Sequence, residues 1–302
     1  MADPAQPFTG AIPKIGVGLR HSHYADALNS VADIDFLEVH AENFFAEGGA
    51  ALAVLDEISQ HYAISIHGTA LSLGSYTGLC SQHLHKLQKL VQRFSPLLIS
   101  DHACFARTLL NNQPVHVGDL LPIEFNERSL ACLVRNIQQV QEILGRPMLI
   151  ENLSAYIQLP GATLTETEFL VNACQQTDCQ LLLDLNNLVV NAHNANIKNI
   201  VPYVIDWIEQ IPSSIVGEFH LAGCTPVPAG EIMVDDHSQP VPDEVWQVYE
   251  HALRRFGPVP TLIEWDTHLP TWNSLLKEAH KARDRAKATL TVESSGTAET
   301  TI

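Results

Sequence analysis

The sequence predicts a single (β/α)8 TIM barrel, an α/β fold. Eight short runs rich in leucine and β-branched residues recur along the chain, and stretches with helical periodicity separate them. Several runs are apolar almost throughout, as is typical of parallel strands that are covered on both faces. The length of 302 residues is normal for one barrel of eight such units. A doubly wound open sheet is the structural alternative.

The predicted strands follow one another through the whole chain. They are Ile15–Arg20, Phe36–His40, Ile64–Thr69, Leu97–His102, Met148–Asn152, Leu181–Asn187, Ile215–Leu221 and Thr261–Asp266. The clearest predicted helix is Asn126–Gly145, because its apolar residues recur at three- and four-residue spacing between a capping residue and a terminating glycine. Thr165 and Glu168 form the capping-box pattern of another helix. Val241–Phe256 and Trp272–Ala286 carry weaker helical patterns.

The domain organisation predicted from these patterns is one barrel with two tails. Residues 1–13 contain three prolines and a glycine, and residues 288–302 are rich in Ser, Thr and Glu with little apolar content. We therefore expect a flexible N-terminal tail over 1–13, a catalytic barrel over 14–287 and a disordered C-terminal tail over 288–302. No internal repeat and no long linker divides the chain.

The charge balance argues against polyanionic partners. The chain has 34 acidic and 17 basic side chains, a formal net charge of −17. Such an excess repels nucleic-acid phosphates and anionic lipid. No run of about 18 uncharged apolar residues would span a membrane, and the first ten residues lack the features of a signal peptide. We therefore expect a cytoplasmic enzyme with no nucleic-acid or membrane partner.

The cysteines carry no obvious chemistry. There are six, with no Cys-x-x-Cys pair among them. In a reducing compartment, cysteines of this kind are mostly small buried apolar residues, so we expect neither a disulfide framework nor thiolate zinc ligands. Cys104 lies two residues after His102, but we do not count it as a nucleophile because cysteine is commonly buried.

Imidazole and carboxylate side chains stand at the C-terminal ends of the predicted strands, where barrel enzymes carry their chemistry. The set comprises His67, His102, Glu151, Asp184, His220 and Glu264, with Asp235 and His237 in the loop after the seventh strand. Each one alone has an ordinary structural explanation. A strand-end histidine commonly bonds to the backbone, for example, and Asp184 can cap the next helix.

Taken together, these residues predict a multinuclear metal site. So many charged groups on one rim would repel one another, or lose hydration at great cost, unless cations held them together. Imidazole and carboxylate ligands without thiolate suit Mn, Fe or Zn. Their number is too large for one ion and sensible for two or three.

Other polar residues near the strand ends are candidates for substrate binding or for orienting the ligands. Arg20 could grip a substrate carboxylate or phosphate, or it could pair with Glu38 or Glu42. Glu42, Asp101, Asn152 and Asp266 are expected to support the ligands or contact substrate. Whether His193 or Asp236 also binds metal stays open. No Ser-His-Asp or Cys-His signature is present, so we expect no catalytic residue beyond the metal ligands.

The series of strand-end ligands resembles that of xylose-isomerase-like barrels. The residues Glu151, Asp184, His220 and Glu264 are similar to the single-metal site of the sugar isomerases and epimerases. The larger set resembles the trinuclear zinc site of endonuclease IV, except that Asn187 stands where that family has histidine.

A narrower resemblance covers nearly the whole domain, from about Ile15 to Ala282. The sequence is similar to the multinuclear non-haem iron-dependent oxidative enzymes, a family that includes methanobactin oxidase and many members described only as uncharacterised. The motifs that carry it are Gly16-Val-Gly-Leu-Arg20, Ser100-Asp-His102, Leu120-Leu-Pro122, Glu151-Asn152, Leu183-Asp-Leu-Asn-Asn187, His220-Leu-Ala-Gly223 and Glu264-Trp-Asp266.

This resemblance implies an oxidoreductase of natural-product biosynthesis that holds two or three iron ions (Fe²⁺/Fe³⁺), with Mn or Zn as alternatives. The implied ligands are His67, His102, Glu151, Asp184, Asn187, His220, Asp235, His237 and Glu264. It also implies O₂-dependent modification of cysteines in a ribosomally made precursor peptide, which a small partner protein presents to the barrel. We find no peptide-recognition motif in the segment 237–242 or in the tails.

Three other functions are compatible with parts of the pattern. A single-metal sugar isomerase or epimerase would use Glu151 and Glu264 as acid and base, but it leaves His67, His102, Asp235 and His237 without a shared purpose. A trinuclear-zinc phosphodiesterase acting on DNA needs basic loops that this acidic chain lacks. A catalytically dead scaffold would show gaps in the ligand set, and Asn187 is the one departure.

Overall fold

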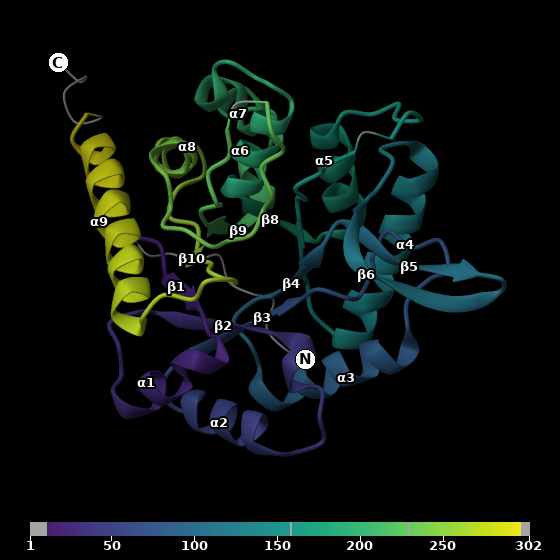
Figure 1. Cartoon of the computed structure of the whole chain (residues 1–302), viewed down its shortest axis with the longest axis horizontal. Helices are drawn as coiled ribbons and strands as arrows, with labels where there is room; N and C mark the ends of the chain where they lie inside the picture. Colours follow the sequence, from purple (N-terminus) through teal and green to yellow (C-terminus); the bar gives the residue numbers. More distant parts are fainter. Residues whose placement is uncertain (1–10, 158, 229, 297–302) are drawn as a thin grey trace. The chain divides into compact units, whose positions relative to one another are not determined.

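The computed structural model describes residues 11–157, 159–228 and 230–296. Eight parallel strands form a closed barrel in the order β1-β10-β9-β8-β7-β4-β3-β2 (Figure 1), which confirms the predicted fold class. The strands are β1 (Ile15–Gly18), β2 (Phe36–His40), β3 (Ala63–Gly68), β4 (Ile99–His102), β7 (Leu149–Glu151), β8 (Gln180–Asp184), β9 (Val216–Leu221) and β10 (Thr261–Ile263). Each overlaps one of the eight predicted runs.

Helices follow the strands in the alternation that the sequence predicts. The α-helices are α1 (Tyr24–Asn29), α2 (Ala50–Ile58), α3 (Ser81–Phe94), α4 (Glu127–Leu144), α5 (Glu166–Thr177), α6 (Leu185–Asn194), α7 (Ile200–Ile208), α8 (Asp243–Phe256) and α9 (Trp272–Gly296). Short 3-10 helices lie at η1 (His21–His23), η2 (Ala41–Phe44) and η3 (Ser213–Ile215). Within the described residues, none of the helices combines the length and apolar character that a bilayer crossing needs.

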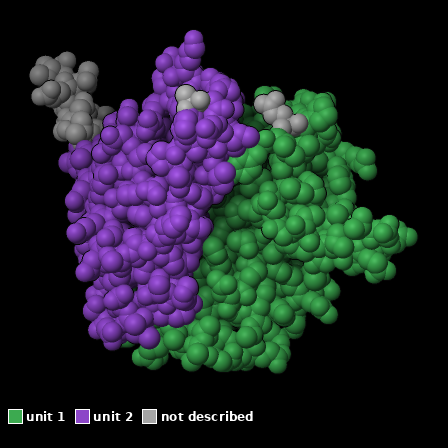
Figure 2. Space-filling view, in the orientation of Figure 1, with its two compact units in different colours: residues 1–4, 38–182 green, residues 5–37, 183–302 purple. Residues whose placement is uncertain are grey.

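The chain divides into two compact units (Figure 2). Unit 1 is built around Glu38–Leu182 and holds β3, β4, β7 and the helices α2 to α5. Unit 2 is built around Leu183–Ile302 together with the chain up to Leu37, and it holds β1, β9, β10, α1 and the helices α6 to α9. Each unit contributes its own set of polar strand ends.

Helix α4 in unit 1 is the clearest case of sequence deciding local structure. Its start is capped by the Asn126 side chain, which accepts hydrogen bonds from the backbone N–H groups of Arg128 and Ser129 at 3.1 and 3.0 Å. It ends at Gly145, whose φ of +68° lies in the left-handed region that glycine adopts without strain. The apolar stripe is buried from Leu130 to Val140, while Ile143 in the last turn is 37% exposed.

Several sequence-based boundaries differ from the structure, and two of the differences have a clear structural basis. The run predicted to extend to Asn187 ends as a strand at Asp184, because the Asp184 carboxylate accepts a hydrogen bond from the Asn187 N–H and so starts helix α6. The C-terminal tail expected from residue 288 is helical as far as Gly296, and Thr289 is only 8% exposed. Residues 1–10 and 297–302 of the two predicted tails lie outside the described residues.

A β-hairpin was missed in the sequence. Strands β5 (Cys104–Leu110) and β6 (Gln113–Pro122) pair antiparallel directly after β4, and they project from unit 1 (Figure 1). The two residues between them, Asn111 and Asn112, have φ values of +50° and +60°. An Asn-Asn pair flanked by β-branched and apolar residues is the signal that could have predicted this turn.

Removal of the α4 cap tests the contribution of local sequence to stability. We expect Asn126→Ala to lower the free energy of unfolding by about 1 kcal/mol, because two backbone N–H groups lose their acceptor. Guanidinium unfolding followed by circular dichroism measures this change. Glu142→Ala, at an exposed position of the same helix, is the control and should stay near wild type. Equal stability of the two variants would contradict the assigned role of the cap.

Candidate metal centre

Three strands of unit 1 bring together a first ligand group, defined as His67, His102 and Glu151. They lie at the ends of β3, β4 and β7, which are neighbours in the sheet. The register places His102 directly opposite Glu151 on β7. Each of the three offers a ligand atom, and these atoms all lie within 4.8 Å of one another. All three residues are buried, with exposed fractions of 8% or less.

The distances within the first ligand group fit a shared cation. The Nε2 atoms of His67 and His102 lie 3.4 and 3.3 Å from Oε2 of Glu151. Donor atoms bound about 2.1 Å from one ion are separated by roughly 3.0–3.4 Å in octahedral or tetrahedral geometry. Two imidazole nitrogens that converge on one carboxylate oxygen therefore have the spacing of metal ligands.

Neighbouring groups fix the orientation of these ligands. Nδ1 of His67 lies 2.8 Å from the Ser100 hydroxyl, which leaves Nε2 directed at Glu151. The Asp101 carboxylate accepts hydrogen bonds from the N–H groups of His102 and Leu71 at 2.7 and 3.1 Å. Asp101 thus holds the backbone of a ligand and does not itself join the group.

The other predicted supporting residues of unit 1 are Glu42, which contacts the backbone close to a ligand, and Asn152, which follows a ligand in the chain. Glu42 accepts a hydrogen bond at 3.1 Å from the N–H of Thr69, two residues beyond His67. Asn152, which follows Glu151, is 1% exposed. Burial raises the pKa of Asp101 well above its ordinary value, and the Glu42 carboxylate adds to that rise. Asp101 and Glu42 therefore support the first ligand group through the backbone around it.

Unit 2 contains a second ligand group, defined as Asp184, His220, Asp235, His237 and Glu264. Potential ligand atoms of Asp184, His237 and Glu264 lie within 4.8 Å of one another. His237 Nε2 is 2.7 Å from Oδ1 of Asp235, and His220 Nδ1 is 2.9 Å from Oε2 of Glu264. The five residues come from the ends of β8 and β9, from the loop after β9 and from the residue after β10.

The loop that carries Asp235 and His237 is fastened at several points. The carbonyl of His237 accepts a hydrogen bond from the Asp266 N–H at 2.9 Å, and the Gln239 N–H donates to the Gly223 carbonyl at 3.0 Å. His237 has a φ of +42°, an uncommon conformation for a residue other than glycine. The Asp236 carboxylate accepts hydrogen bonds from Thr225 and Ser238, so its structural role is to hold the loop together.

Arg20 and Asp266 support the second ligand group from one side. The guanidinium of Arg20 binds Oδ1 of Asp266, with Nε at 3.0 Å, and its Nη2 lies 3.7 Å from Glu264. Oδ2 of Asp266 is 3.3 Å from Nδ1 of His237. Within unit 2 Arg20 forms ion pairs with Asp266 and Glu264, which are other partners than the Glu38 or Glu42 suggested by the sequence.

Burial of so many charged groups shifts their pKa values. Burial raises the pKa of Asp184 to about 7, with Asp235 and Glu264 adding to the rise. Burial alone would lower the pKa of His237, but Asp235 and Glu264 outweigh it and raise that pKa well above its usual value. Burial is thus the first cause for Asp184 and neighbouring carboxylates are the cause for His237. A bound cation would stabilise the charged carboxylates in both cases.

The remaining predicted residues of unit 2, Asn187 and His193, lie on helix α6. Asn187 is 2% exposed on α6, and its backbone N–H bonds to Asp184. His193 lies on the same helix, nearly two turns further along the chain.

Sequence reasoning missed Asn186 and Cys224 as a support for Asp235. Nδ2 of Asn186 donates to Asp235 at 2.8 Å and lies 3.1 Å from the Cys224 sulfur. The sequence Asp184-Leu185-Asn186 at the end of β8 could have indicated that Asn186 lies close to the predicted ligands.

Solved structures with this architecture define the class of the fold. Endonuclease IV from Thermus thermophilus superposes with a TM-score of 0.59 at 14% identity, covering 91% of this chain and all of that chain (100%). A xylose isomerase domain protein from Alicyclobacillus acidocaldarius gives 0.57 at 13% identity, covering 93% and 98%. The D-psicose 3-epimerase from Clostridium cellulolyticum H10 gives 0.52 at 13% identity, covering 92% and 97%. The chain is therefore a xylose-isomerase-like TIM barrel.

Sequence comparison identifies the family within that class. Residues 14–287 match the family described as RiPP precursor modification enzyme MbnB/TglH/ChrH, and the chain belongs to it. A UPF0276 protein of Vibrio vulnificus (strain YJ016) is 42% identical over 280 residues, which cover 92% of this chain and 93% of the relative. A UPF0276 protein of Anaeromyxobacter sp. (strain Fw109-5) is 37% identical over 289 residues, covering 96% and 98%.

Gly68, the last residue of β3, lies close to the Asp101 side chain. A larger residue at this position tests whether Asp101 is held firmly beside the first ligand group. A Cβ atom on Gly68 would lie 2.4 Å from Oδ2 of the buried Asp101. We expect Gly68→Ala to lower the free energy of unfolding by roughly 1–3 kcal/mol, as overpacking does in a dense interior. Thermal unfolding measures the effect.

The control is Gly48→Ala, at a position where an added Cβ meets nothing within 4 Å. It should unfold at nearly the wild-type temperature. If Gly68→Ala were as stable as this control, Asp101 would not be held in the position described.

Proposed function

We propose that this protein is an iron-dependent enzyme that uses O₂ to modify cysteine residues of a ribosomally made precursor peptide. The description of its family as RiPP precursor modification enzymes supports a peptide as the substrate. The observation that carries the metal part of the proposal is the pair of buried histidine–carboxylate groups, one in each unit. Neither group contains a thiolate, and this donor chemistry suits iron, manganese or zinc.

We propose that each ligand group holds at least one iron ion. In unit 1 the ligands are His67, His102 and Glu151, whose converging atoms have the spacing of metal ligands. In unit 2 they are Asp184, His220, Asp235, His237 and Glu264, with Asn187 as a further candidate. Two groups of this kind are consistent with two or three ions per chain, as the resemblance to the iron-dependent oxidative enzymes implies.

Iron held in these groups supplies Lewis acidity toward a substrate sulfur and one-electron chemistry toward O₂. The chain's own residues prepare that chemistry. Ser100 orients His67, Arg20 balances the charge of Asp266 and Glu264, and Asn186 fixes Asp235. We also propose that a small partner protein presents the precursor peptide to the barrel.

Metal content tests the two ligand groups separately. After anaerobic purification, we expect more than one iron per chain by plasma mass spectrometry. His102→Ala and Asp184→Ala should each lose part of that iron, and the double variant should lose more than either, because the two residues serve different groups. His280→Ala, an exposed histidine on α9, should retain all of it.

Circular dichroism must show that each variant is folded. Unchanged iron in both single variants would contradict the ligand assignment. One manganese or magnesium per chain would favour a sugar isomerase or epimerase, and three zinc ions would favour a phosphodiesterase of the endonuclease IV type.

The substrate class is tested with a short cysteine-containing peptide encoded beside the gene, together with any small protein encoded there. We expect the iron-loaded enzyme to consume O₂ and to change the mass of that peptide. A Cys→Ser version of the peptide is the matched control and should stay unmodified. Equal O₂ consumption with both peptides, or a mass change that leaves every cysteine intact, would contradict cysteine modification.

A further inference from the structure

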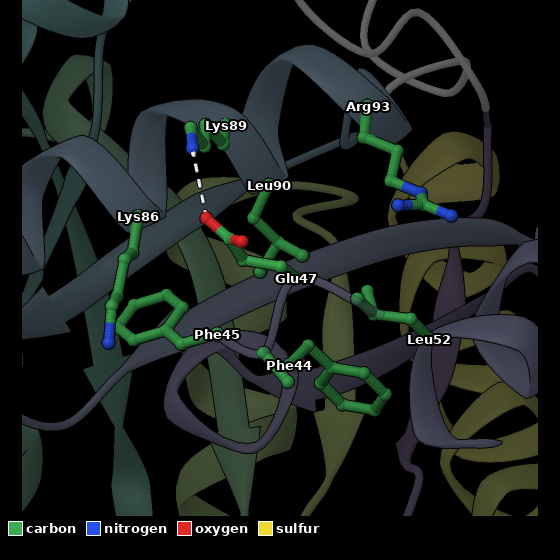
Figure 3. Close-up of a pocket in the computed structure, with 9 residues that line it drawn as sticks. Phe44, Phe45, Glu47, Leu52, Lys86, Lys89, Leu90 and Arg93 are labelled. Carbon is green, nitrogen blue, oxygen red and sulfur yellow. Dashed lines mark ion pairs between the residues drawn. The ribbon is translucent and has the colours of Figure 1, made fainter. Parts of the chain in front are cut away.

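A cavity of about 380 Å³ in unit 1 is lined by helix α3 and by the segment that runs from η2 into α2 (Figure 3). Its apolar lining comes from Phe44, Phe45, Leu52 and Leu90. Three cations of helix α3 line it as well: Lys86, Lys89 and Arg93. None of these seven residues belongs to either ligand group, so the cavity is a separate surface feature.

The sequence of α3 places those cations on one side of the helix. Leu84, Leu87, Leu90 and Val91 are buried against the barrel. Residues 86, 89 and 93 are spaced by three and four positions, so their side chains follow one another along the helix surface. The helix rises 1.5 Å per residue, which makes this row about 10 Å long. In a chain with 34 acidic and 17 basic residues, such a basic row is a marked local reversal of charge.

The present contacts of the three cations differ. Arg93 is committed to Asp56 on α2, with Nε 2.8 Å from Oδ1. Nζ of Lys89 lies 3.8 Å from Oε1 of Glu47, whose side chain is 95% exposed. Nζ of Lys86 lies 6.0 Å from the centre of the Phe45 ring. Figure 3 shows Lys86 beside Phe45 and the Glu47 carboxylate turned toward Lys89.

An exposed ion pair of this length contributes little to stability, about 0–1 kcal/mol. An incoming carboxylate can therefore replace Glu47 at Lys89 at small cost. Among the described residues that line the cavity, Glu47 is the single acidic one. The cavity thus combines an apolar floor with two lysines that an acidic ligand can reach.

We propose that this cavity docks an acidic segment of the precursor peptide, and this inference rests on the proposed function. One large apolar side chain of the segment fills the floor formed by Phe44, Phe45, Leu52 and Leu90. Its carboxylates pair with Lys86 and Lys89. Lys86 and Lys89 are three residues apart, about 4.5 Å along the helix axis, so two carboxylates of one acidic segment can each reach one of them. A peptide is the occupant that the proposed function supplies.

Contacts within unit 1 join the cavity to the strand end that carries His67. The Phe45 ring meets the edge of the His83 ring at a centroid distance of 4.8 Å. Nε2 of His83 lies 3.2 Å from the Glu42 carboxylate, which in turn accepts the hydrogen bond from the Thr69 N–H. Thr69 is two residues beyond His67. The residues that line the cavity are therefore in contact, through His83 and Glu42, with the backbone that follows His67.

Fluorescence anisotropy with labelled synthetic peptides tests the docking. The probe is a fluorescein-labelled 12-residue peptide of Asp and Glu interspersed with Leu and Phe, and its matched control carries Asn and Gln in place of the acids. The full-length iron-loaded protein should bind the acidic probe at least tenfold more tightly than the amide control. Added salt should weaken the binding, since exposed charges are screened.

Charge reversal identifies the cavity as the binding surface. We expect Lys86→Glu/Lys89→Glu to bind the acidic probe at least tenfold more weakly than wild type. The control is Lys198→Glu/Lys277→Glu, which makes the same charge change at two exposed lysines outside the cavity. It should bind like wild type. Equal losses in both variants, or no loss in the first, would overturn the proposal.

Other occupants give different outcomes. Lysine-dependent binding of dodecanoate without binding of the acidic peptide would overturn the proposal in favour of a fatty acid. Lysine-dependent self-association in ultracentrifugation, again without peptide binding, would overturn it in favour of a second copy of the chain.

Iron content separates this proposal from the proposed function. Lys86→Glu/Lys89→Glu should hold as much iron as wild type, because neither lysine belongs to a ligand group. If the wild-type protein holds iron and modifies its peptide but does not bind the acidic probe, the docking proposal fails alone. If it binds the probe through the two lysines but holds no iron, the proposed function fails alone.

Discussion

The burial of carboxylates is the constraint on which the rest of the structure depends. Glu151 and Asp184 are 1% and 0% exposed, and Glu264 is 4% exposed. A buried carboxylate loses its hydration, and neighbouring carboxylates repel it further, so each one demands a positive partner or a proton. In the second ligand group His237 meets part of this demand, since Asp235 and Glu264 raise its pKa, and Arg20 meets another part. Burial is the main cause of the raised pKa of Asp184, about 7, and the nearby carboxylates of Asp235 and Glu264 add to it.

The two ligand groups meet this constraint with different architectures. In unit 1 the ligands sit on adjacent strands, and the sheet register itself brings His102 and Glu151 together. In unit 2 a long loop supplies Asp235 and His237, and it is fixed by hydrogen bonds to Asp266, Gly223 and Thr225. The first ligand group is therefore as rigid as the barrel sheet, whereas the second ligand group depends on how well its loop is fastened. The two groups therefore differ in what holds their residues in place.

In this acidic protein, the basic row of α3 is the surface feature on which the proposed peptide docking depends. A net charge of −17 keeps polyanions away from most of the surface. The basic row of α3 is an exception that lies over an apolar cavity, and it selects ligands that are both acidic and apolar. The negative charge of the rest of the chain increases this preference. It repels an acidic peptide from the other surfaces, whereas the basic row attracts it.

The sequence by itself determined the architecture and showed which polar residues stand at the strand ends. Eight apolar runs fixed the barrel because parallel strands covered on both faces must be apolar, and polar residues at their ends stood out against that background. The Asn126 cap of α4 and the capping box of α5 were also predicted, since helix caps depend on residues only a few positions apart. The hairpin of β5 and β6 was not predicted, although its Asn-Asn turn is a local signal.

Only the tertiary structure determined which candidate ligands contact one another and which side chains hydrogen-bond to them. The contacts of Ser100 with His67 and of Arg20 with Asp266 join residues that are 33 and 246 positions apart. The same holds for the meeting of α3 with Phe44 and Phe45 around the cavity. Such contacts depend on sheet register and helix packing, which are set by the sum of many weak interactions across the fold, and no short pattern of residues encodes them.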